Sequence, residues 1–220
     1  MEIKPIGKIR CGFTDKFGIP RQSGRVAQLV GEIVLEREFS SPDFLRGIDE
    51  FSHLWIIFAF DRCEGKWSST VRPPRLGGNE RRGVFATRSP FRPNNLGLTV
   101  AKIENITFGE NTIISVSGID LLDGTPVFDI KPYLPTADIV NDATGGFAKQ
   151  VNDYRLAVEI ACPTTGVDEK ILSAIVGCIA DDPRPAYHDD ERIYKMDYSG
   201  YKIEFSVLNT TATILSIKKV

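Results

Sequence analysis

Apolar residues recur at every second position through most of the first 135 residues, and this pattern limits the fold more than any other feature of the chain. Because successive side chains of a strand point to opposite faces, a period of two is typical of half-buried strands. The expected strands span residues 3–9, 25–35, 53–60, 83–87, 96–108, 112–120 and 125–131. So many short strands predict a β-barrel or a β-sandwich. One short helix is expected over residues 42–48, with Ser41 as its N-cap.

The chain changes character near residue 135, where the period-two pattern ends. Residues 136–152 gather Asp, Asn, Thr and Gly without periodicity, which is typical of a long connection or a domain boundary. Beyond it we expect a strand, a helix and a three-stranded meander, over residues 154–161, 168–180 and 193–219. The chain is therefore predicted to be mainly β, with an N-terminal domain over residues 1–138 and a small α+β domain over residues 152–220.

Composition excludes some classes of protein. With 220 residues, 42% of them apolar, the chain can bury a sizeable core, and its net charge of −2 argues against coating nucleic acid through charge alone. The four cysteines, Cys11, Cys63, Cys162 and Cys178, lack C-x-x-C spacing and are expected to be reduced core residues. The longest apolar run, residues 54–60, is too short to span a membrane, and no signal-peptide pattern opens the chain. We therefore expect a cytoplasmic protein that does not enter a membrane.

The strongest local signal is a cluster of six arginines within 21 residues: Arg72, Arg75, Arg81, Arg82, Arg88 and Arg92. Glu80 is the only acidic residue between Gly65 and Ile103, against eight Lys and Arg. The prolines around the cluster fix φ and disfavour helix, so the guanidinium groups project from stiff backbone. Since the local charge is strongly positive, the cluster predicts a site for an anion. The alternative is a solvated loop that is merely rich in arginine.

The sequence lacks the residue patterns of most catalytic and metal centres. Only two histidines occur; we expect His53, at the start of a predicted strand, to be structural, and His188 to be exposed. No residues show zinc-ligand spacing, so we expect no metal site. G-x-S-x-G, Walker and G-x-G-x-x-G motifs are also missing.

Carboxylates are the remaining candidates for chemistry, and three of them, Asp120, Asp123 and Asp129, lie within ten residues. Asp123 precedes Gly124 and is expected to form a turn. Asp120 and Asp129 each interrupt an apolar strand, which predicts buried carboxylates that need hydrogen-bond donors or a ligand. Tyr133 follows them. It either positions a proton or stacks on a base, or it packs at the rim of a barrel.

Several longer motifs carry a resemblance to a known family. They are P-R-Q at residues 20–22, F-S-H-L-W-I at 51–56, T-V-R-P-P-R-L-G-G-N at 70–79, G-V-F-A-T-R-S-P-F-R-P-N at 83–94, D-L-L-D-G-T-P-V-F-D-I-K-P-Y-L-P at 120–135 and D-P-R-P-A-Y at 182–187. With these motifs in this order, the chain resembles the tRNA (adenine-N6)-methyltransferase TrmO family, the TsaA-like proteins, over most of its length.

The resemblance implies an S-adenosylmethionine-dependent methyltransferase whose catalytic domain is a β-barrel and which works as a homodimer. It implies tRNA as the partner, with a methyl group added to N6 of threonylcarbamoyladenosine next to the anticodon. The threonyl carboxylate and the neighbouring phosphates of such a substrate are anions, which would account for the arginine cluster. The C-terminal domain is expected to contact the tRNA.

The family pattern also leads us to expect roles for particular residues. The cofactor is expected to contact Ser23, Gly24, Arg25, Asp61, Arg62, Arg88, Ser89, Pro90, Val100, Ile119, Asp120, Leu121 and Leu122. The tRNA is expected to contact Arg72, Arg75, Arg92, Asn94, Lys131 and Arg184. The catalytic residues are expected among Arg88, Asp120, Asp129 and Tyr133. The sequence departs from the common pattern at Asn95, Thr99 and Asp61, where the family often has Pro, Ser and His.

Two other classes of protein compete with the enzyme. One is a module that binds S-adenosylmethionine or RNA without turnover, and the retained Arg88, Arg92, Asp120 and Asp129 argue against it. The other is a purely structural β-barrel, which would leave the arginine cluster unexplained.

Overall fold

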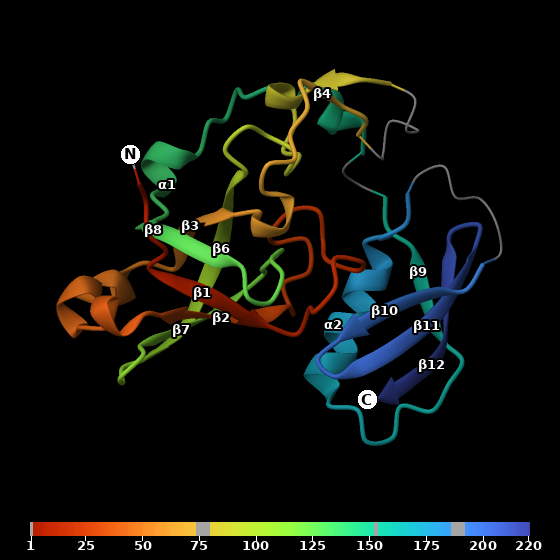
Figure 1. Cartoon of the computed structure of the whole chain (residues 1–220). Coiled ribbons are helices and arrows are strands. Elements are labelled where there is room, and N and C mark those ends of the chain that lie inside the picture. The colour runs from red at the N-terminus through yellow and green to blue at the C-terminus, as the bar shows by residue number, and fades with distance from the viewer. Residues whose placement is uncertain (1, 74–79, 152–153, 186–191) are drawn as a thin grey trace.

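The computed structural model describes residues 2–73, 80–151, 154–185 and 192–220, which form a β-barrel and a smaller α+β domain (Figure 1). Six strands close the barrel in the order β1-β2-β7-β6-β3-β8, and every neighbouring pair is antiparallel. Their bounds are β1 Gly7–Cys11, β2 Val30–Leu35, β3 His53–Ala59, β6 Leu96–Thr107, β7 Ile113–Ser117 and β8 Pro126–Pro132. The structure thus confirms the barrel.

The alternation of apolar residues is what lets these strands surround a core. In β3, Leu54, Ile56 and Phe58 are buried inside the barrel, whereas the residues between them are partly exposed. Strands β1 and β2 alternate in the same way. Each large apolar side chain moved from water to the core contributes roughly 1.5–3 kcal/mol, so this inward face favours closure.

The expectation of a strand over residues 83–87 is wrong. Only Gly83 of these residues is extended, in β5 (Arg82–Gly83), which pairs with β4 (Thr70–Val71) in a separate two-stranded sheet. A 3-10 turn, η6 (Val84–Ala86), follows at once. Both the backbone N–H and the hydroxyl of Thr87 donate to the Val84 carbonyl, at 3.1 and 2.9 Å. These local hydrogen bonds replace the ladder that a barrel strand would need.

Short 3-10 helices replace the longer helix expected over residues 42–48. The segment between β2 and β3 carries three of them: η1 (Arg37–Phe39), η2 (Pro42–Leu45) and η3 (Ile48–Glu50). The Ser41 hydroxyl caps η2 by accepting the Asp43 N–H at 3.4 Å, as the sequence predicts. A further turn, η4 (Asp61–Cys63), follows β3.

The C-terminal domain is a four-stranded sheet with one long helix. Its strands lie in the order β10-β11-β12-β9, and β9 runs parallel to β12. The bounds are β9 Ala157–Ile160, α2 Glu169–Ala180, β10 Tyr194–Tyr198, β11 Tyr201–Leu208 and β12 Thr211–Lys219. Asp168 caps α2 by accepting two N–H groups, from Lys170 at 2.9 Å and Ile171 at 3.2 Å. The connection from the barrel contains α1 (Pro135–Asp138) and η7 (Gly146–Val151).

The segment between β1 and β2, residues 12–29, lies between the barrel and the C-terminal domain, as the red loop beside α2 in Figure 1 shows. Its aromatic residues pack into the second domain, with Phe13 against Tyr198 at 4.8 Å between ring centroids and Phe17 stacked on Tyr194 at 6.1 Å. Buried residues of both domains form one continuous cluster through these contacts. We call residues 12–29 the bridging loop.

All four cysteines are free, as expected, but only Cys178 is buried in the core, and Cys11, Cys63 and Cys162 are partly exposed. Burial raises the pKa of Cys11 to about 11 and that of Cys178 to about 12, which keeps both thiols protonated near neutral pH. Within the described part of the chain, no helix is both long and apolar enough to cross a membrane.

Candidate active site

The arginine-rich loop that precedes β6 is held in shape by its own side chains. One guanidinium nitrogen of Arg92 donates to the carbonyl oxygens of Thr87 and Ser89, at 2.8 and 3.4 Å. The Asn95 side-chain amide donates to the Pro90 carbonyl at 2.7 Å. Arg92, expected to contact the tRNA, therefore supports the loop in this structure.

Asn95 also explains one departure from the family pattern. Its φ of 48° lies in the left-handed region, which asparagine tolerates and which the fixed φ of proline, near −65°, cannot reach. The Asn95 carbonyl accepts the Phe60 N–H at 2.8 Å and so ties the loop to the end of β3, just before η4. The predicted cofactor residues Asp61 and Arg62 in η4 consequently lie beside the loop that carries Arg88, Ser89 and Pro90.

Asp120, which follows β7, is the centre of the candidate site. The Thr99 hydroxyl, on the inward face of β6, donates to Oδ1 of Asp120 at 2.6 Å, and the Ser23 backbone N–H lies near enough to this carboxylate to lower its pKa. Burial raises the pKa of Asp120 above its ordinary value, and the hydrogen bonds and the nearby Arg88 charge oppose that rise. Thr99 was not among the predicted site residues.

The bridging loop reaches this carboxylate through Ser23 and Gly24. The Gly24 N–H donates to the Gly118 carbonyl at 2.8 Å, and its φ of 74° is one that glycine adopts without strain. Arg88 donates a hydrogen bond to the side-chain oxygen of Gln22. Residues from three distant parts of the chain thus meet around Asp120, and they include four of the predicted cofactor residues: Ser23, Gly24, Arg88 and Asp120.

Other predicted cofactor residues are less accessible. Ile119 and Leu121 are buried in the barrel core, so only their backbone can face a ligand. Leu122 packs against the same core. Val100 pairs with Trp55 of β3 and, like it, lies on the outward face. Arg25 forms an ion pair with Asp181, at the end of α2.

Asp129 lies apart from Asp120, and the expectation that it is buried is wrong. Its side chain is 46% exposed and forms an ion pair with Lys131 at 2.8 Å. Asp129 pairs with Ile57, which lies on the outward face of β3. The register of β8 therefore directs this carboxylate out of the barrel, away from Thr99.

Tyr133 packs at the barrel rim, which is one of the two alternatives that the sequence left open. Its ring lies 5.7 Å from the Trp55 ring and 6.3 Å from the His53 ring, between centroids. Its backbone N–H donates to the His53 carbonyl at 3.0 Å. Trp55 is on the outward face of β3, so Tyr133 and the Asp120 carboxylate occupy opposite sides of the barrel wall.

The predicted tRNA contacts differ in accessibility. Arg72 and Asn94 are exposed, and Arg75 lies outside the described residues. Arg184 was expected on an exposed connection, but its side chain is only 11% exposed and forms a two-pronged ion pair with Asp182, at 2.8 and 3.0 Å. Its guanidinium also lies 6.0 Å from the centre of the Tyr194 ring. This side chain is therefore largely engaged within the protein.

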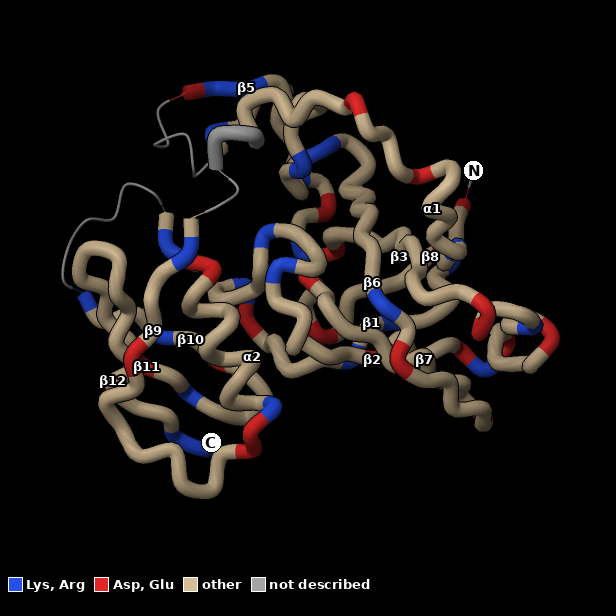
Figure 2. Tube along the Cα trace, turned by 180° about the vertical axis from the view of Figure 1, so that it is seen from behind, with Lys and Arg blue, Asp and Glu red and all other residues tan. Residues whose placement is uncertain are grey.

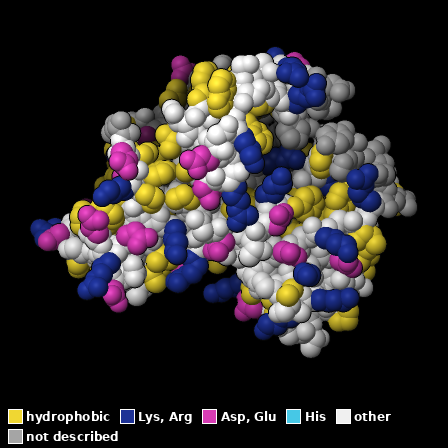
Figure 3. All heavy atoms as spheres, viewed as in Figure 1, with side chains coloured by type: hydrophobic (Ala, Val, Ile, Leu, Met, Phe, Trp, Pro, Cys, Tyr) yellow, Lys and Arg dark blue, Asp and Glu magenta, His cyan; other side chains and the backbone are white. Residues whose placement is uncertain are grey.

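Positive charge gathers where the barrel loops face the C-terminal domain. Figure 2 shows basic segments from both domains on this side, and Figure 3 shows Lys and Arg side chains around a hollow between them. Arg21 of the bridging loop belongs to this region, because it donates to the Arg184 carbonyl at 2.8 Å. A positively charged hollow between two domains can hold an anionic ligand.

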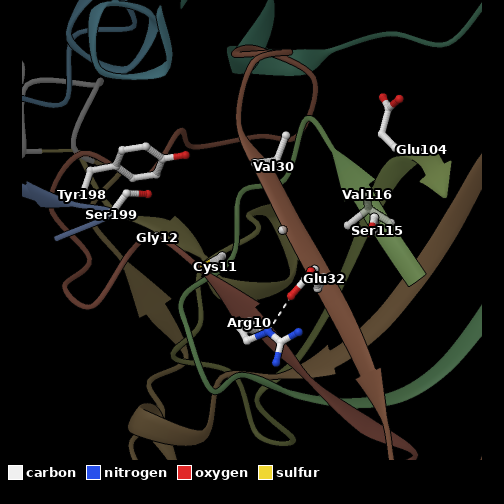
Figure 4. Close-up of a pocket in the computed structure, with 11 residues that line it drawn as sticks. Arg10, Cys11, Gly12, Val30, Glu32, Glu104, Ser115, Val116, Tyr198 and Ser199 are labelled. Atoms are coloured by element: carbon white, nitrogen blue, oxygen red, sulfur yellow. Dashed lines mark hydrogen bonds and ion pairs between the residues drawn. The ribbon is translucent and has the colours of Figure 1, made fainter. Parts of the chain in front are cut away.

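A separate cavity of about 330 Å³ lies between the outer barrel wall and the β10–β11 turn (Figure 4). Its charged side chains already have partners: Arg10 pairs with Glu32 at 2.5 Å, and Glu104 with Lys102 at 3.0 Å. None of the residues gathered around Asp120 lines it. Across the described ranges, no cluster of His, Cys, Asp and Glu is suited to hold a metal ion.

Fold and site together define a two-domain protein whose β-barrel carries a partly buried carboxylate beside an arginine-rich loop. A family model described as the tRNA-methyltransferase O N-terminal domain matches residues 8–139, and one described as the TrmO C-terminal domain matches residues 157–220. The chain therefore belongs to the tRNA-methyltransferase O family.

Individual relatives agree with the family. The tRNA (adenine(37)-N6)-methyltransferase of Escherichia coli is 40% identical over 218 residues, which cover 94% of this chain and 91% of that protein. An S-adenosyl-L-methionine-binding protein of Archaeoglobus fulgidus is 39% identical over 145 residues, covering 66% of this chain and 98% of that protein. The crystal structure of TrmO from Pseudomonas aeruginosa superposes with a TM-score of 0.80 at 32% identity, covering 100% of this chain and 97% of that chain.

Proposed function

We propose that this protein is an S-adenosylmethionine-dependent methyltransferase that adds a methyl group to N6 of adenine 37 of tRNA. The observation that carries this conclusion is the match to both family domains, together with 40% identity over 94% of the chain to a relative of that name. The gathering of Ser23, Gly24, Arg88 and Asp120 supports it, because the same residues are those expected at the cofactor.

The residues around Asp120 suit the polar groups of this cofactor. S-adenosylmethionine supplies a methyl group on a positively charged sulfur, and it also carries an ammonium, a carboxylate and ribose hydroxyls. The Asp120 carboxylate can accept hydrogen bonds from the ammonium or the hydroxyls, and Arg88 can pair with the carboxylate. Gly24 has open space within 4 Å of the position that a Cβ would take, so the backbone there is accessible to a ligand.

The acceptor nitrogen needs help from the protein. The lone pair of N6 is delocalised into the adenine ring, and in threonylcarbamoyladenosine also into a carbonyl group, so it is a weak nucleophile. The protein must hold it in line with the methyl group and assist the loss of its proton. We assign proton acceptance to Asp120 as a second role, since burial raises its pKa and makes it a better base than an ordinary carboxylate. Asp129 and Tyr133 lie on the outer wall of the barrel, and a catalytic role for either of them remains a prediction.

We assign recognition of the tRNA to the exposed arginines of the cluster. Arg72, Arg81 and Arg88 are exposed, whereas Arg82 pairs with Glu80 at 2.5 Å and Arg92 supports the loop. A guanidinium can bind the threonyl carboxylate through two parallel hydrogen bonds. We therefore infer that the modified adenosine is preferred over the unmodified one.

We also propose that the protein works as a homodimer in the cytoplasm. Large apolar side chains remain exposed on the β6 strand and the loop before it: Leu96, Leu98, Phe85 and Phe91. Hydrophobic side chains also gather over the barrel in the face that Figure 3 shows. Contiguous exposed apolar patches are uncommon in monomers and are typical of interfaces.

The proposed function is tested by methyl transfer from labelled S-adenosylmethionine to tRNA, followed by digestion and identification of the methylated nucleoside. Label in the N6-methyl derivative of the adenosine next to the anticodon is the expected result. Binding of the cofactor without transfer to any tRNA would favour a module without turnover, which the name of the archaeal relative allows.

A further inference from the structure

We propose that the C-terminal domain positions the cofactor-binding part of the bridging loop, and that Asp181 is the residue through which it does so. The inference rests on the proposed function in one respect, namely that Ser23 and Gly24 contact the cofactor. It gives the C-terminal domain a role beyond contact with the tRNA.

One side of the bridging loop is fixed to the C-terminal domain at several points. The Ser199 N–H donates to the Gly12 carbonyl at 2.8 Å, and Met196 packs against Gly18. Farther along, Val26 lies so close to α2 that a Cβ on Gly177 would be 2.6 Å from its Cγ1. These contacts leave the loop little freedom to move independently of the domain.

The other side of the loop forms one wall of the candidate site. The Gly24 N–H donates to the Gly118 carbonyl, and the Gln22 side chain accepts a hydrogen bond from Arg88. The Ser23 N–H lies near the Asp120 carboxylate and lowers its pKa. The three loop residues in these contacts, Gln22, Ser23 and Gly24, lie within three positions of Arg25 in the sequence. A shift of Arg25 therefore moves the groups that surround Asp120.

Arg25 is held by an ion pair with Asp181, which caps the C-terminal end of α2. The pair is largely shielded from water, with side-chain exposures of 18% for Arg25 and 4% for Asp181. The negative end of the helix dipole also favours a cation at this place. Arg155, in the same domain, donates to the Arg25 carbonyl. Removing one partner of a shielded pair leaves the other charge without compensation, so the pair is a strong constraint on the loop.

Asp181 reaches the candidate site through its ion pair with Arg25, so it acts as a positioning residue. From the sequence we expect the C-terminal domain to be a separate unit that contacts the tRNA. The bridging loop changes that expectation, because its conformation depends on contacts with both domains.

The test is calorimetric titration of S-adenosylmethionine into the full chain and its Asp181→Asn variant, without tRNA. We expect the Kd for the cofactor to rise about tenfold in the variant, in the range typical of coupling between sites. Asp181→Glu, which keeps the charge, is expected to recover most of the affinity. Glu204→Gln is the matched control, because it breaks an exposed ion pair of the same domain, Lys195–Glu204 at 3.1 Å, that does not touch the loop.

A second variant keeps the test valid if Asp181→Asn fails to fold. Gly177→Ala alters no charge, but its Cβ must push Val26 of the loop away, and we expect it also to weaken cofactor binding. Wild-type affinity in Asp181→Asn, or in Gly177→Ala when Asp181→Asn is unfolded, overturns the inference. A wild-type protein that binds no cofactor would instead contradict the proposed function, so the two failures are distinguishable.

Discussion

Asp120 is subject to two opposing influences, and their balance has a measurable consequence for stability. Burial raises the pKa of Asp120 above its ordinary value of 3.8, while Thr99, Ser23 and the Arg88 charge act in the opposite direction. Between the unfolded and the folded pKa, the native state holds a proton that the unfolded chain has lost. The free energy of unfolding therefore falls as pH rises through this window.

Asp120→Asn removes this fall because asparagine does not titrate. We expect the stability of the variant relative to wild type to increase with pH from about pH 4, and to level off above the folded pKa of Asp120. Urea unfolding of both proteins over a series of pH values measures the difference. Parallel stability curves would show that the pKa of Asp120 is the same in the folded and unfolded states.

Arg88→Ala is expected to abolish most activity without harming the fold. Arg88 is exposed and contacts the bridging loop through Gln22, so its loss should change the free energy of unfolding by about 0.5 kcal/mol or less. Removing a charged group from the site is expected to lower kcat/KM by about 100-fold or more. Arg37→Ala, which removes an exposed arginine paired with Glu110 at 3.2 Å, is the control. Equal activity in both variants would remove Arg88 from the site.

At the scale of residues, the sequence could identify polar groups in apolar strands but not the face on which they lie. Asp120 and Asp129 show the same pattern, yet one is held by Thr99 and the other pairs with Lys131 on the outer wall. A bulge between β3 and β8, at Ile57 and Phe58, shifts the register there, and such a shift is not visible in the sequence. The same limit applies to the arginines. Arg92 donates to backbone carbonyls of its own loop, whereas Arg88 donates to Gln22 of the bridging loop, and the sequence does not distinguish the two cases.

At the scale of elements, the loop before β6 depends on Arg92. Its guanidinium donates to two backbone carbonyl oxygens of the loop, so Arg92→Gln is expected to lower the free energy of unfolding by about 1–2 kcal/mol. Asn94→Ala, at an exposed neighbouring position, is expected to change it by about 0.5 kcal/mol or less. Chemical unfolding of both variants provides the comparison. A fully stable Arg92→Gln protein with a raised KM for tRNA would instead indicate that Arg92 contacts the tRNA.

The limits of a strand could be predicted from the sequence where its apolar residues alternate because one face is buried in the barrel. They could not be predicted where other contacts determine the backbone conformation. The strands β3, β6 and β8 begin and end within one residue of their expected limits. By contrast, the strand expected from residue 25 begins only at Val30, because Arg25 and Val26 contact the C-terminal domain and the Leu29 N–H closes a local turn on the Val26 carbonyl. Residues 83–87 also alternate, but local hydrogen bonds fold Val84–Ala86 into a 3-10 helix.

At the scale of the whole molecule, the exposed apolar side chains predict self-association. Leu98→Glu places a charge in the proposed interface and is expected to give a monomer with reduced activity. Val30→Glu is the control, because Val30 is an apolar residue of similar exposure, 57% against 54%, on β2, a different strand of the barrel. Sedimentation velocity distinguishes the species. A monomeric, fully active wild-type protein would contradict the dimer.

The preference for a modified adenosine is also a property of the assembled site. A site built around a polar group can reject a substrate that lacks it by about 10⁴-fold, because the unpaired partner stays desolvated. Phosphate contacts are identical in the two tRNAs and contribute no discrimination. Initial rates on one tRNA, before and after threonylcarbamoylation at fixed salt, measure the preference. Rates that agree within a few-fold would indicate that the arginines bind only the RNA backbone and not the threonyl carboxylate.

Transfer of a methyl group from S-adenosylmethionine to adenine 37 of tRNA can be tested by comparing two tRNAs that differ only at that position. Purified protein is incubated with labelled cofactor and either a tRNA carrying threonylcarbamoyladenosine at position 37 or the same tRNA with guanosine there. We expect near-stoichiometric labelling of the first tRNA, with the label at N6, and none of the second. Equal labelling of both, or labelling of neither by a protein that binds the cofactor, would contradict it.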